Sequence, residues 1–397
     1  MQIVRINKNW FKCFYLYCIS LMNFLFRNSS KRIVDQFKTI VIYQKGGLGD
    51  FIMLLPTIIS LKKSGNNIKI DFVTTSNVME LVNRFNDLYK LFFRIRIIGS
   101  NNENIIFKIK SFCSEIFLNT IYKYDMFFHS WPPDSSMIIT IALLTRSRRR
   151  IGIQQNKNYK LYDSTIYSSG EDPVIMLNAT LLHYLKLPVQ YLVDPVPIKE
   201  VEKINALEKL YKASKLSLGQ INKKNYLLIG LYLHSAGNTK NPKHWSAKNY
   251  AILLESISKK FNNAQFLLLG SLKDKEFYDN IIINLRNTNN ISILAGATTI
   301  FEDYYLVSRC NLFIGIDGGF THLVNTLRIQ SVIIWISTSE NMYGYKNDCT
   351  TNISTNALNK SFRNDYRSNK KKNINCFEDI SIEKVYNACI EKLKSHY

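Results

Sequence analysis

The segment Leu312-Phe313-Ile314-Gly315-Ile316-Asp317-Gly318-Gly319-Phe320-Thr321-His322 joins a short apolar stretch to a glycine-rich turn. The apolar stretch, residues 312–316, is typical of a buried β-strand, and residues 321–327 beyond the turn are typical of a helix. A turn that opens a helix presents unbonded backbone N–H groups, and the dipole of the helix favours a negative charge there. We therefore expect a β-α unit with a turn that suits a phosphate group.

The same alternation of apolar strands and amphipathic helices occurs along the rest of the chain. Strands are expected at Thr39–Tyr43, Ile68–Thr74, Leu91–Ile98, Met126–His129 and Arg150–Ile153, and then at Tyr226–Leu233, Gln265–Leu269, Ile291–Leu294, Leu312–Ile316 and Ser331–Ile336. Helices are expected at Asp50–Lys63, Val78–Leu88 and Met176–Leu185, and then at Lys199–Lys215, Tyr250–Lys260, Asp274–Leu285, Ile300–Ser308 and Thr321–Leu327. This pattern predicts an α/β protein whose parallel sheets are covered by helices on both faces.

The chain has 397 residues, which is too long for one ordinary hydrophobic core, so we expect two domains. Pro188, Pro195 and Pro197 interrupt the alternation, because proline lacks a backbone donor and resists helix formation. The expected divisions are an N-terminal apolar and basic segment (1–37), a first Rossmann-like domain (38–190), a linker (191–200), a second Rossmann-like domain (201–380) and a C-terminal helix (381–397). The polar stretch Ser337–Asp379 is expected to be irregular.

Composition limits the function classes. The hydrophobic content of 46% excludes a disordered chain, and the formal net charge of +22 favours an anionic partner such as a phosphorylated lipid, a membrane surface or nucleic acid. A general bias toward lysine, asparagine and isoleucine would also produce this charge. No nucleic-acid-binding signature is found. The seven cysteines and six histidines show no disulfide or metal-ligand spacing, which favours a reducing cytoplasm and no metal site.

The stretch 13–26 near the N-terminus is uncharged and apolar, with basic residues on both sides. It is shorter than the roughly 20 residues that a bilayer-spanning helix needs. One interpretation is a helix that lies in the membrane interface. The other is a helix that packs on the first domain.

A second glycine-rich turn, Lys45-Gly46-Gly47-Leu48-Gly49-Asp50, follows the first expected strand. It matches neither a P-loop nor a dinucleotide fingerprint, because no Gly-Lys-Ser/Thr follows and Ile52 stands at the third glycine position. Asp50 would lie at the carboxyl end of a strand, where α/β sheets bind ligands. Its carboxylate could accept a proton from a sugar hydroxyl, or it could only cap its helix.

Small and hydroxyl residues, Ser235-Ala236-Gly237-Asn238-Thr239, follow a strand of the second domain, and Lys243 and Trp245 come shortly after them. Such residues suit phosphate oxygens, although a lysine is usually a surface residue and Trp245 is expected to be a core residue. Asp317 is expected to bond the backbone of its turn or to pair with Lys243. His322 either contacts a phosphate or caps the turn. The run Arg146–Arg150 either grips acceptor phosphates or forms a solvated positive edge.

In order and spacing these motifs resemble those of glycosyltransferase family 9, the lipopolysaccharide heptosyltransferase group. The resemblance runs from about residue 38 to about residue 344. The matching residues are Thr39–Ile42, Gly47-Leu48-Gly49-Asp50, Pro56, Leu61-Lys62, Arg150-Ile151-Gly152, Lys243-His244-Trp245, Phe266–Gly270, Gly296-Ala297-Thr298-Thr299 and Asp317-Gly318-Gly319-Phe320-Thr321-His322-Leu323.

The resemblance implies a GT-B fold, with two Rossmann-like β/α/β domains that face each other across a cleft. It implies inverting, metal-independent and cofactor-free transfer of a sugar, heptose from ADP-heptose, to a lipopolysaccharide core or related glycolipid. Residues 38–190 would be the acceptor side, with Asp50 as general base in the turn that holds Gly47 and Gly49. Residues 201–380 would bind the nucleotide sugar through Asn238, Thr239, Lys243, Thr298, Asp317, Gly318, Gly319, Thr321 and His322.

The resemblance further implies a bacterial, cytoplasmic enzyme, peripheral on the inner face of the inner membrane, with an anionic glycolipid acceptor and no nucleic-acid partner. Three positions depart from the family pattern. Gly318 stands where a serine or threonine is usual, Asn238 replaces a hydroxyl residue, and Ser271–Asp274 stands where an acid often holds the nucleoside. These departures leave open a UDP-hexose or UDP-N-acetylhexosamine transferase, or a relative that binds nucleotide sugars without transferring them.

Overall fold

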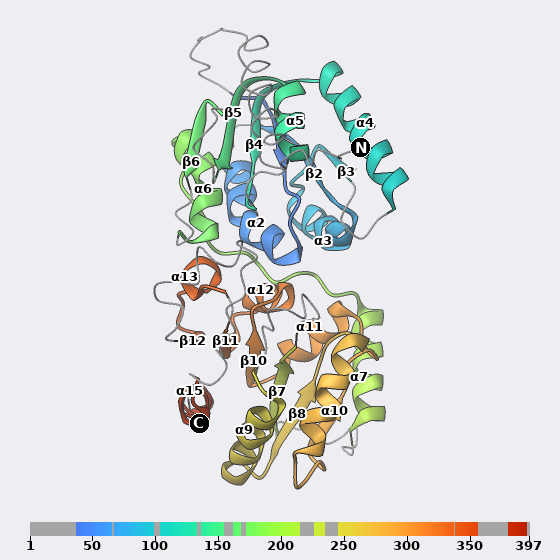
Figure 1. The fold of residues 1–397 in the computed structure, drawn as a ribbon, viewed down its shortest axis with the longest axis vertical. Helices are drawn as coiled ribbons and strands as arrows, with labels where there is room; N and C mark the ends of the chain where they lie inside the picture. The colour runs from blue at the N-terminus through green and yellow to red at the C-terminus, as the bar shows by residue number, and fades with distance from the viewer. Residues whose placement is uncertain are drawn as a thin grey trace, which may run out of the picture. The chain divides into compact units, whose positions relative to one another are not determined.

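The structure of the chain is a computed structural model, and Figure 1 shows its fold. It describes residues 37–65, 67–98, 104–132, 136–154, 162–167, 172–214, 226–234, 245–336, 338–355 and 380–394. The chain divides into two compact units, Met1–Val193 and Asp194–Tyr397. The division falls in the proline-containing segment between the two sets of β-α units.

The first unit contains a six-stranded sheet in which every strand pairing is parallel. Its strands are β1 (Thr39–Tyr43), β2 (Lys69–Thr75), β3 (Arg94–Ile98), β4 (Lys123–His129), β5 (Arg146–Gln154) and β6 (Ser164–Tyr167). Its helices are α2 (Leu48–Lys63), η1 (Ser76–Val78), α3 (Met79–Tyr89), α4 (Ile105–Ile121), α5 (Ser136–Leu144) and α6 (Val174–Tyr184). The strand order is β3-β2-β1-β4-β5-β6.

Side chains of the first sheet alternate between two helical layers, because successive residues of a strand point to opposite faces. Val41 and Tyr43 of β1 belong to a buried cluster with residues of α5, and Phe112 of α4 packs against this cluster. On the other face, Phe51 of α2 lies 5.6 Å from the ring of Phe72 on β2. Central strands that are buried on both faces need continuous apolar sequence, which explains the apolar run at 39–43.

The second unit repeats this architecture. Its strands are β7 (Leu227–Tyr232), β8 (Ala264–Leu268), β9 (Ile291–Ile293), β10 (Leu312–Ile316), β11 (Ser331–Trp335) and β12 (Thr350–Ser354). Its helices are α7 (Glu200–Ala213), α9 (Ala247–Lys260), η2 (Leu272–Asp274), α10 (Lys275–Ile283), α11 (Ile300–Ser308), α12 (Gly319–Asn325), α13 (Glu340–Tyr343) and α15 (Ile382–Lys394). The sheet is parallel, in the order β12-β11-β10-β7-β8-β9.

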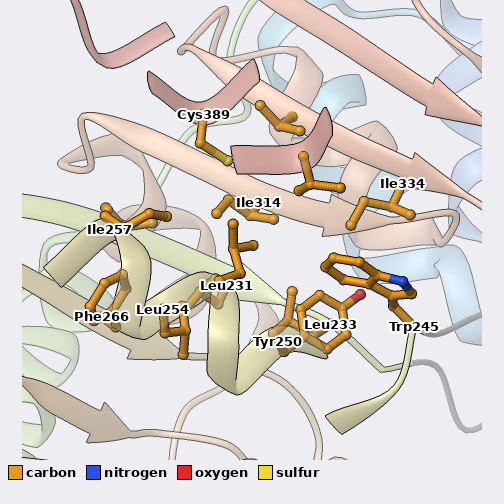
Figure 2. Close-up of a cluster of buried hydrophobic side chains, with 14 of the residues drawn as sticks. Leu231, Leu233, Trp245, Tyr250, Leu254, Ile257, Phe266, Ile314, Ile334 and Cys389 are labelled. Atoms are coloured by element: carbon orange, nitrogen blue, oxygen red, sulfur yellow. The ribbon is translucent and has the colours of Figure 1, made fainter. Parts of the chain in front are cut away.

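One large buried cluster of this unit lies between one face of the sheet and helices α9, α10 and α15. Figure 2 shows Trp245 beside Tyr250, and their ring planes are nearly perpendicular with centroids 5.3 Å apart. Trp245 is fully buried, so its expected role as a core residue is confirmed. Cys389 of α15 reaches the same cluster near Ile314 (Figure 2). The last helix therefore belongs to the core of the second unit.

Both sheets have the same order when their strands are numbered within each unit, namely 3-2-1-4-5-6, which is the Rossmann order. In this order the direction of winding reverses between the first and fourth strands. That point lies between β1 and β4 in the first unit, and between β7 and β10 in the second. Ligands of open α/β sheets bind outside the carboxyl ends of the strands at such a point.

Three sequence-based expectations are corrected. The stretch 337–379 is not wholly irregular, because it contains α13 and the edge strand β12, which pairs with β11. β6 has no counterpart among the expected strands. β5 begins at Arg146 rather than Arg150, because Arg146 pairs with Lys123 at the start of β4. The apolar stretch 13–26 lies outside the described residues, and so do both of its interpretations.

Candidate active site

Asp50 lies at the carboxyl end of β1, in the first turn of α2. Its Oδ2 accepts a hydrogen bond from the backbone N–H of Gly47 at 2.8 Å. A Cβ atom added at Gly46 would lie 2.2 Å from the same oxygen, so only glycine at position 46 leaves room for the carboxylate. Asp50 thus does cap its helix, and because it remains partly exposed, capping and proton transfer are compatible.

The neighbouring strand β4 ends beside this turn, because Tyr43 pairs with His129 in the sheet. Nδ1 of His129 lies 3.0 Å from the Tyr162 hydroxyl, and a Cβ at Gly152 would lie 2.3 Å from the Tyr162 ring. The glycine of the expected Arg-Ile-Gly motif therefore gives Tyr162 room to reach the histidine. No motif marks His129 in the sequence, although its position at the end of a central strand could have done so.

Two lysines add positive charge at the same edge of the first sheet. Burial lowers the pKa of Lys45 in the glycine-rich turn, and the charge of Lys108 near the start of α4 lowers it further. The effect of the Lys108 charge on Lys45 indicates that these two cations share one region of the surface. Such a region favours a negatively charged group of a ligand.

The arginine run Arg146–Arg150 starts at the amino ends of the strands of the first sheet, opposite the carboxyl ends where Asp50 lies. β5 begins with it, and its first residue pairs with Lys123 at the start of β4. Nη1 of Arg148 lies 3.3 Å from the Asp125 carboxylate, and the Arg148 side chain is 62% exposed. Arg148 thus fits a solvated positive edge, whereas Arg150 is partly buried and its Nη2 donates to the carbonyl oxygens of Leu143 and Thr145 at 3.3 and 3.4 Å. The run lies away from the carboxyl edge that carries Asp50.

In the second unit, Asp317 directly follows β10 and is buried. Its Oδ1 lies 3.8 Å from Nε2 of the buried His322. Nδ1 of His322 lies 3.0 Å from the hydroxyl of Tyr345, which is protonated at neutral pH, and burial raises the pKa of Tyr345 further above neutral. The imidazole is therefore held between a carboxylate and a phenol. Tyr345 lies in the stretch that was expected to be irregular, and no sequence signal marks it.

The turn between Asp317 and His322 contains two glycines. Gly318 precedes α12 with an extended backbone (φ −177°), and a Cβ added there would meet no atom within 4 Å. The hydroxyl of Thr321 donates to the carbonyl oxygen of Ile316 at 2.6 Å and is buried. Thr321 thus closes the turn onto the end of β10, whereas Gly318 leaves open space beside it.

The loops that follow β8 and β9 run side by side. The N–H of Gly296 donates to the carbonyl oxygen of Gly270 at 2.9 Å, and both glycines have positive φ angles, +78° and +144°. The Thr298 hydroxyl, which carries one donor hydrogen, lies within hydrogen-bond distance of both the Leu294 carbonyl oxygen and the Asp303 carboxyl group. Thr298, an expected donor-binding residue, therefore also has a structural partner.

Asp303 is a buried carboxyl group on α11. Burial raises its pKa to about 7, against the opposing effect of the hydrogen bonds from Thr298 and from the backbone of Gly270. Its charge therefore changes near neutral pH. No sequence signal marks Asp303, because an aspartate in a helix is usually a surface residue.

A histidine and a carboxylate form a close pair at the end of β7. Nδ1 of His234 lies 2.6 Å from Oδ1 of Asp274. Oδ2 of Asp274 accepts hydrogen bonds at 2.7 Å from both the N–H and the hydroxyl of Ser271. Burial favours the neutral acid, but the bonds from His234 and Ser271 outweigh it and lower the pKa of Asp274. Asp274 thus orients His234 and stabilises the loop after β8.

Apart from Thr298, the expected donor-side residues fall into two groups. Asp317, Gly318, Gly319, Thr321 and His322 form one turn at the end of β10, next to the end of β7, because β7 and β10 are paired. Asn238, Thr239 and Lys243 lie outside the described residues. The expected ion pair between Asp317 and Lys243 therefore stays a prediction.

Among the residues that the structure describes, no group of three or more His, Cys, Asp and Glu side chains is arranged to hold a metal ion. In the same part of the chain, every helix is too short or too polar to cross a bilayer.

Comparisons with solved structures find the same fold elsewhere. A glycosyltransferase family 9 protein from Veillonella parvula DSM 2008 aligns with 91% of this chain and 98% of its own, at 16% identity and a TM-score of 0.67. ADP-heptose lps heptosyltransferase II from E. coli aligns with 90% of this chain and 99% of its own, at 18% identity and a TM-score of 0.62. E. coli heptosyltransferase WaaC with ADP aligns with 89% and 99%, at 11% identity and a TM-score of 0.58. With the two Rossmann sheets, these likenesses establish the GT-B fold.

No curated protein matches the sequence. The family model for glycosyltransferase family 9 (heptosyltransferase) matches residues 131–374. This range begins later than the expected resemblance, so the turn with Asp50 lies outside it, and it extends past residue 344. Because the match covers more than half of the chain, the protein belongs to glycosyltransferase family 9, the heptosyltransferase family.

Proposed function

We propose that this protein is an inverting glycosyltransferase that moves heptose from ADP-heptose to a hydroxyl of a lipopolysaccharide core or related glycolipid. The observation that carries this proposal is the Asp50 carboxylate, held by the Gly47 N–H at the carboxyl end of β1. A carboxylate that is fixed at the ligand edge of an α/β sheet is suitably placed for general-base catalysis.

In the proposed reaction, the acceptor hydroxyl oxygen attacks the anomeric carbon of the donor sugar and forms the new C–O bond. The bond from that carbon to the diphosphate breaks on the opposite side, which inverts the configuration. The hydroxyl proton passes to Asp50, and the nucleoside diphosphate leaves with the bonding electrons. Preorganised charge that stabilises such a leaving group is usually the largest single contribution to the rate.

The second unit would supply this charge. Lys243, with Asn238 and Thr239 nearby in sequence, is proposed to contact the diphosphate. Asp317 and His322 would shape the turn beside it, because the phenol and the carboxylate fix the imidazole between them. No cofactor is proposed, since the nucleotide sugar is the second substrate.

The acceptor is proposed to be anionic and to lie in a membrane. The cationic pair Lys45 and Lys108 at the edge that carries Asp50 supports an acceptor with phosphate or carboxylate groups. The protein would then work at the cytoplasmic face of the inner membrane. UDP-hexose and UDP-N-acetylhexosamine stay alternative donors, because Gly318 and Ser271–Asp274 depart from the family pattern.

Calorimetric titration of the purified protein against ADP, UDP, GDP and CMP, without added metal, tests the donor assignment. We expect selective binding of ADP, its loss in Lys243→Ala, and its retention in Lys259→Ala, which removes an exposed lysine on α9. Selective binding of UDP would keep the mechanism and change the sugar. Absence of binding to all four nucleotides would contradict the proposal and favour a relative that does not transfer sugars.

A further inference from the structure

Helix α4 exposes large apolar side chains along one side. Ile106 is 73% exposed, Ile109 57%, Phe117 64% and Ile121 54%. Steps of three or four residues, with the exposed Cys113 between Ile109 and Phe117, place them in a single stripe. We call this stripe the outer α4 face. In Figure 1, α4 lies on the outside of the first unit.

The inner side of α4 is fixed to the sheet by buried contacts. Glu115 accepts a hydrogen bond from the Tyr43 hydroxyl and lies 3.1 Å from Nη1 of Arg96. Asn119 donates to the same Tyr43 hydroxyl at 2.8 Å, and Phe112 packs against the buried cluster of the first unit. These contacts fix the rotation of the helix about its axis. The outer α4 face is therefore exposed by the packing of the fold.

The edge strand β3 packs beside α4 and presents Arg94 and Arg96 to it, whereas Phe93 and Ile97 alternate with these arginines toward the other face of the sheet. The Arg94 guanidinium lies 3.7 Å from the centre of the Tyr122 ring, directly after α4, and 5.3 Å from the centre of the Phe93 ring. The Lys69 ammonium lies 5.0 Å from the same Phe93 ring. Cations thus border the apolar side chains where α4 ends.

The exposed charges on α4 are all positive. Residues 105–121 contain a single carboxylate, Glu115, and it is buried on the inner side. The exposed Lys110 lies on the outer side of the helix, and the exposed Lys123 follows its end, whereas Lys108 lies on the side of Glu115. An apolar stripe bordered by cations is the pattern of a helix that lies in the plane of an anionic membrane.

We propose that the outer α4 face docks the protein onto an anionic membrane surface. A protein partner fits this surface less well, because lysine is depleted from protein–protein interfaces. The inference rests on the proposed function, since a glycolipid acceptor would lie in the same membrane. Helix α4 follows β3 of the parallel sheet, and β1, which carries the acceptor-side turn, lies in the same sheet.

Vesicle flotation with the full-length chain tests the proposal. Vesicles of phosphatidylglycerol and phosphatidylethanolamine are compared with vesicles of phosphatidylcholine alone, at low and high salt. We expect binding only to the anionic vesicles and weaker binding at high salt. Replacing Ile109 and Phe117 together by serine should weaken binding by at least about tenfold, because two large apolar side chains no longer enter the lipid. Lys110→Ser should weaken it by roughly fivefold.

The matched control is the double change Val201→Ser and Ile204→Ser on α7, where both side chains are more than half exposed. This variant should bind vesicles like the unaltered protein. Circular dichroism and thermal unfolding should be unchanged in both double variants, because all four side chains are exposed. Equal vesicle binding by the α4 variant and the control would overturn the proposal and assign any membrane contact to another part of the chain.

A fluorescent probe on Cys113 distinguishes a membrane from other occupants of the face. Cys13, Cys18, Cys349 and Cys376 are replaced by serine, and an environment-sensitive fluorophore is attached to Cys113. We expect a blue shift when anionic vesicles are added, and quenching by lipids that carry a spin label near the headgroup. A probe that is shielded before vesicles are added and does not respond to them would show that another segment or a second copy covers the face, which overturns the proposal.

Vesicle binding is measured without any sugar transfer, so the two proposals can fail separately. If the unaltered protein binds vesicles but shows no transferase activity, only the proposed function is contradicted. Intact activity toward a soluble acceptor fragment, without vesicle binding, would contradict only the docking surface.

Discussion

Gly47 donates its backbone N–H to Oδ2 of Asp50 at 2.8 Å, which ties the glycine-rich turn to the first turn of α2. Asp50→Asn keeps an oxygen that can accept this bond but removes the base. We expect kcat to fall by at least about a hundredfold, because general-base catalysis contributes this much or more. Nucleotide affinity, measured by calorimetry, should not change.

A suitable comparison for that variant is Gly46→Ala, whose Cβ would collide with the carboxylate at 2.2 Å. It should lower stability and activity together, whereas Asp50→Asn should lower activity alone. Wild-type turnover by Asp50→Asn would rule out Asp50 as the base.

Gly318→Ser should be tolerated by the fold, since the backbone is extended there and a Cβ meets no atom within 4 Å. The new hydroxyl restores a group that the family pattern usually has next to the donor turn. One additional hydrogen bond contributes about 1 kcal/mol, which predicts roughly fivefold tighter nucleotide binding. Calorimetric titration of the variant measures this change.

The control is Gly296→Ser. Its Cβ would lie 2.8 Å from the Leu272 backbone, at a φ of +78° that favours glycine. This change should destabilise the second unit. Unchanged or weaker nucleotide binding by Gly318→Ser would place the donor away from this turn.

The raised pKa of Asp303 predicts that its contribution to stability falls as pH rises. The pKa of the Asp303 carboxyl group is 3.8 in the unfolded chain and about 7 in the folded protein. Between these two pH values, only the native state holds the proton. Stability is then greatest below the lower value and declines up to the higher one, by up to about 4 kcal/mol. Asp303→Asn does not titrate and should be the more stable protein at pH 8.

Urea unfolding of both proteins from pH 4.5 to 8 checks this expectation. The difference between the two free energies of unfolding should change in favour of the variant as pH rises. A difference that stays constant across this range would show that Asp303 does not titrate there.

The buried ion pair between Glu115 and Arg96 predicts a large stability effect. Their side chains are 3% and 10% exposed. Glu115→Ala leaves the guanidinium with one partner fewer in the interior, which should cost about 3–5 kcal/mol. Combining it with Arg96→Met removes the buried charge and should recover much of the loss. Urea unfolding of the single and double variants measures the coupling, and additive losses would contradict it.

Central strands are the part of the fold that sequence predicts best. The apolar runs at Thr39–Tyr43 and Leu312–Ile316 predict two strands, and the structure confirms both to the residue. Both are buried on both faces, so nearly their whole length is apolar, apart from the half-buried Thr39 that begins β1. The edge strands β6 and β12 have the mixed sequences STIY and TTNIS. Because pairing with a neighbour determines where such strands lie, no apolar run marks them.

The candidate site can likewise be predicted only in part from the sequence. Asp50 and Asp317 can be found from sequence, because each lies in a glycine-rich turn directly after an apolar strand. Their partners cannot be found in this way. The contact of His322 with Tyr345 spans 23 residues, and that of His234 with Asp274 spans 40. Such contacts depend on how loops from different strands pack, which local patterns do not encode.

The parallel order of the second sheet has a consequence for the newly made chain. β7 pairs with β10 as well as β8, and the N–H of Leu228 bonds to Asn311, 83 residues further along. No hairpin can nucleate this sheet, and closing such long loops slows folding. During synthesis, β7 cannot complete its pairing until β10 has left the ribosome. A bound nucleotide that needs the edge formed by both strands would therefore report that the second unit has finished folding.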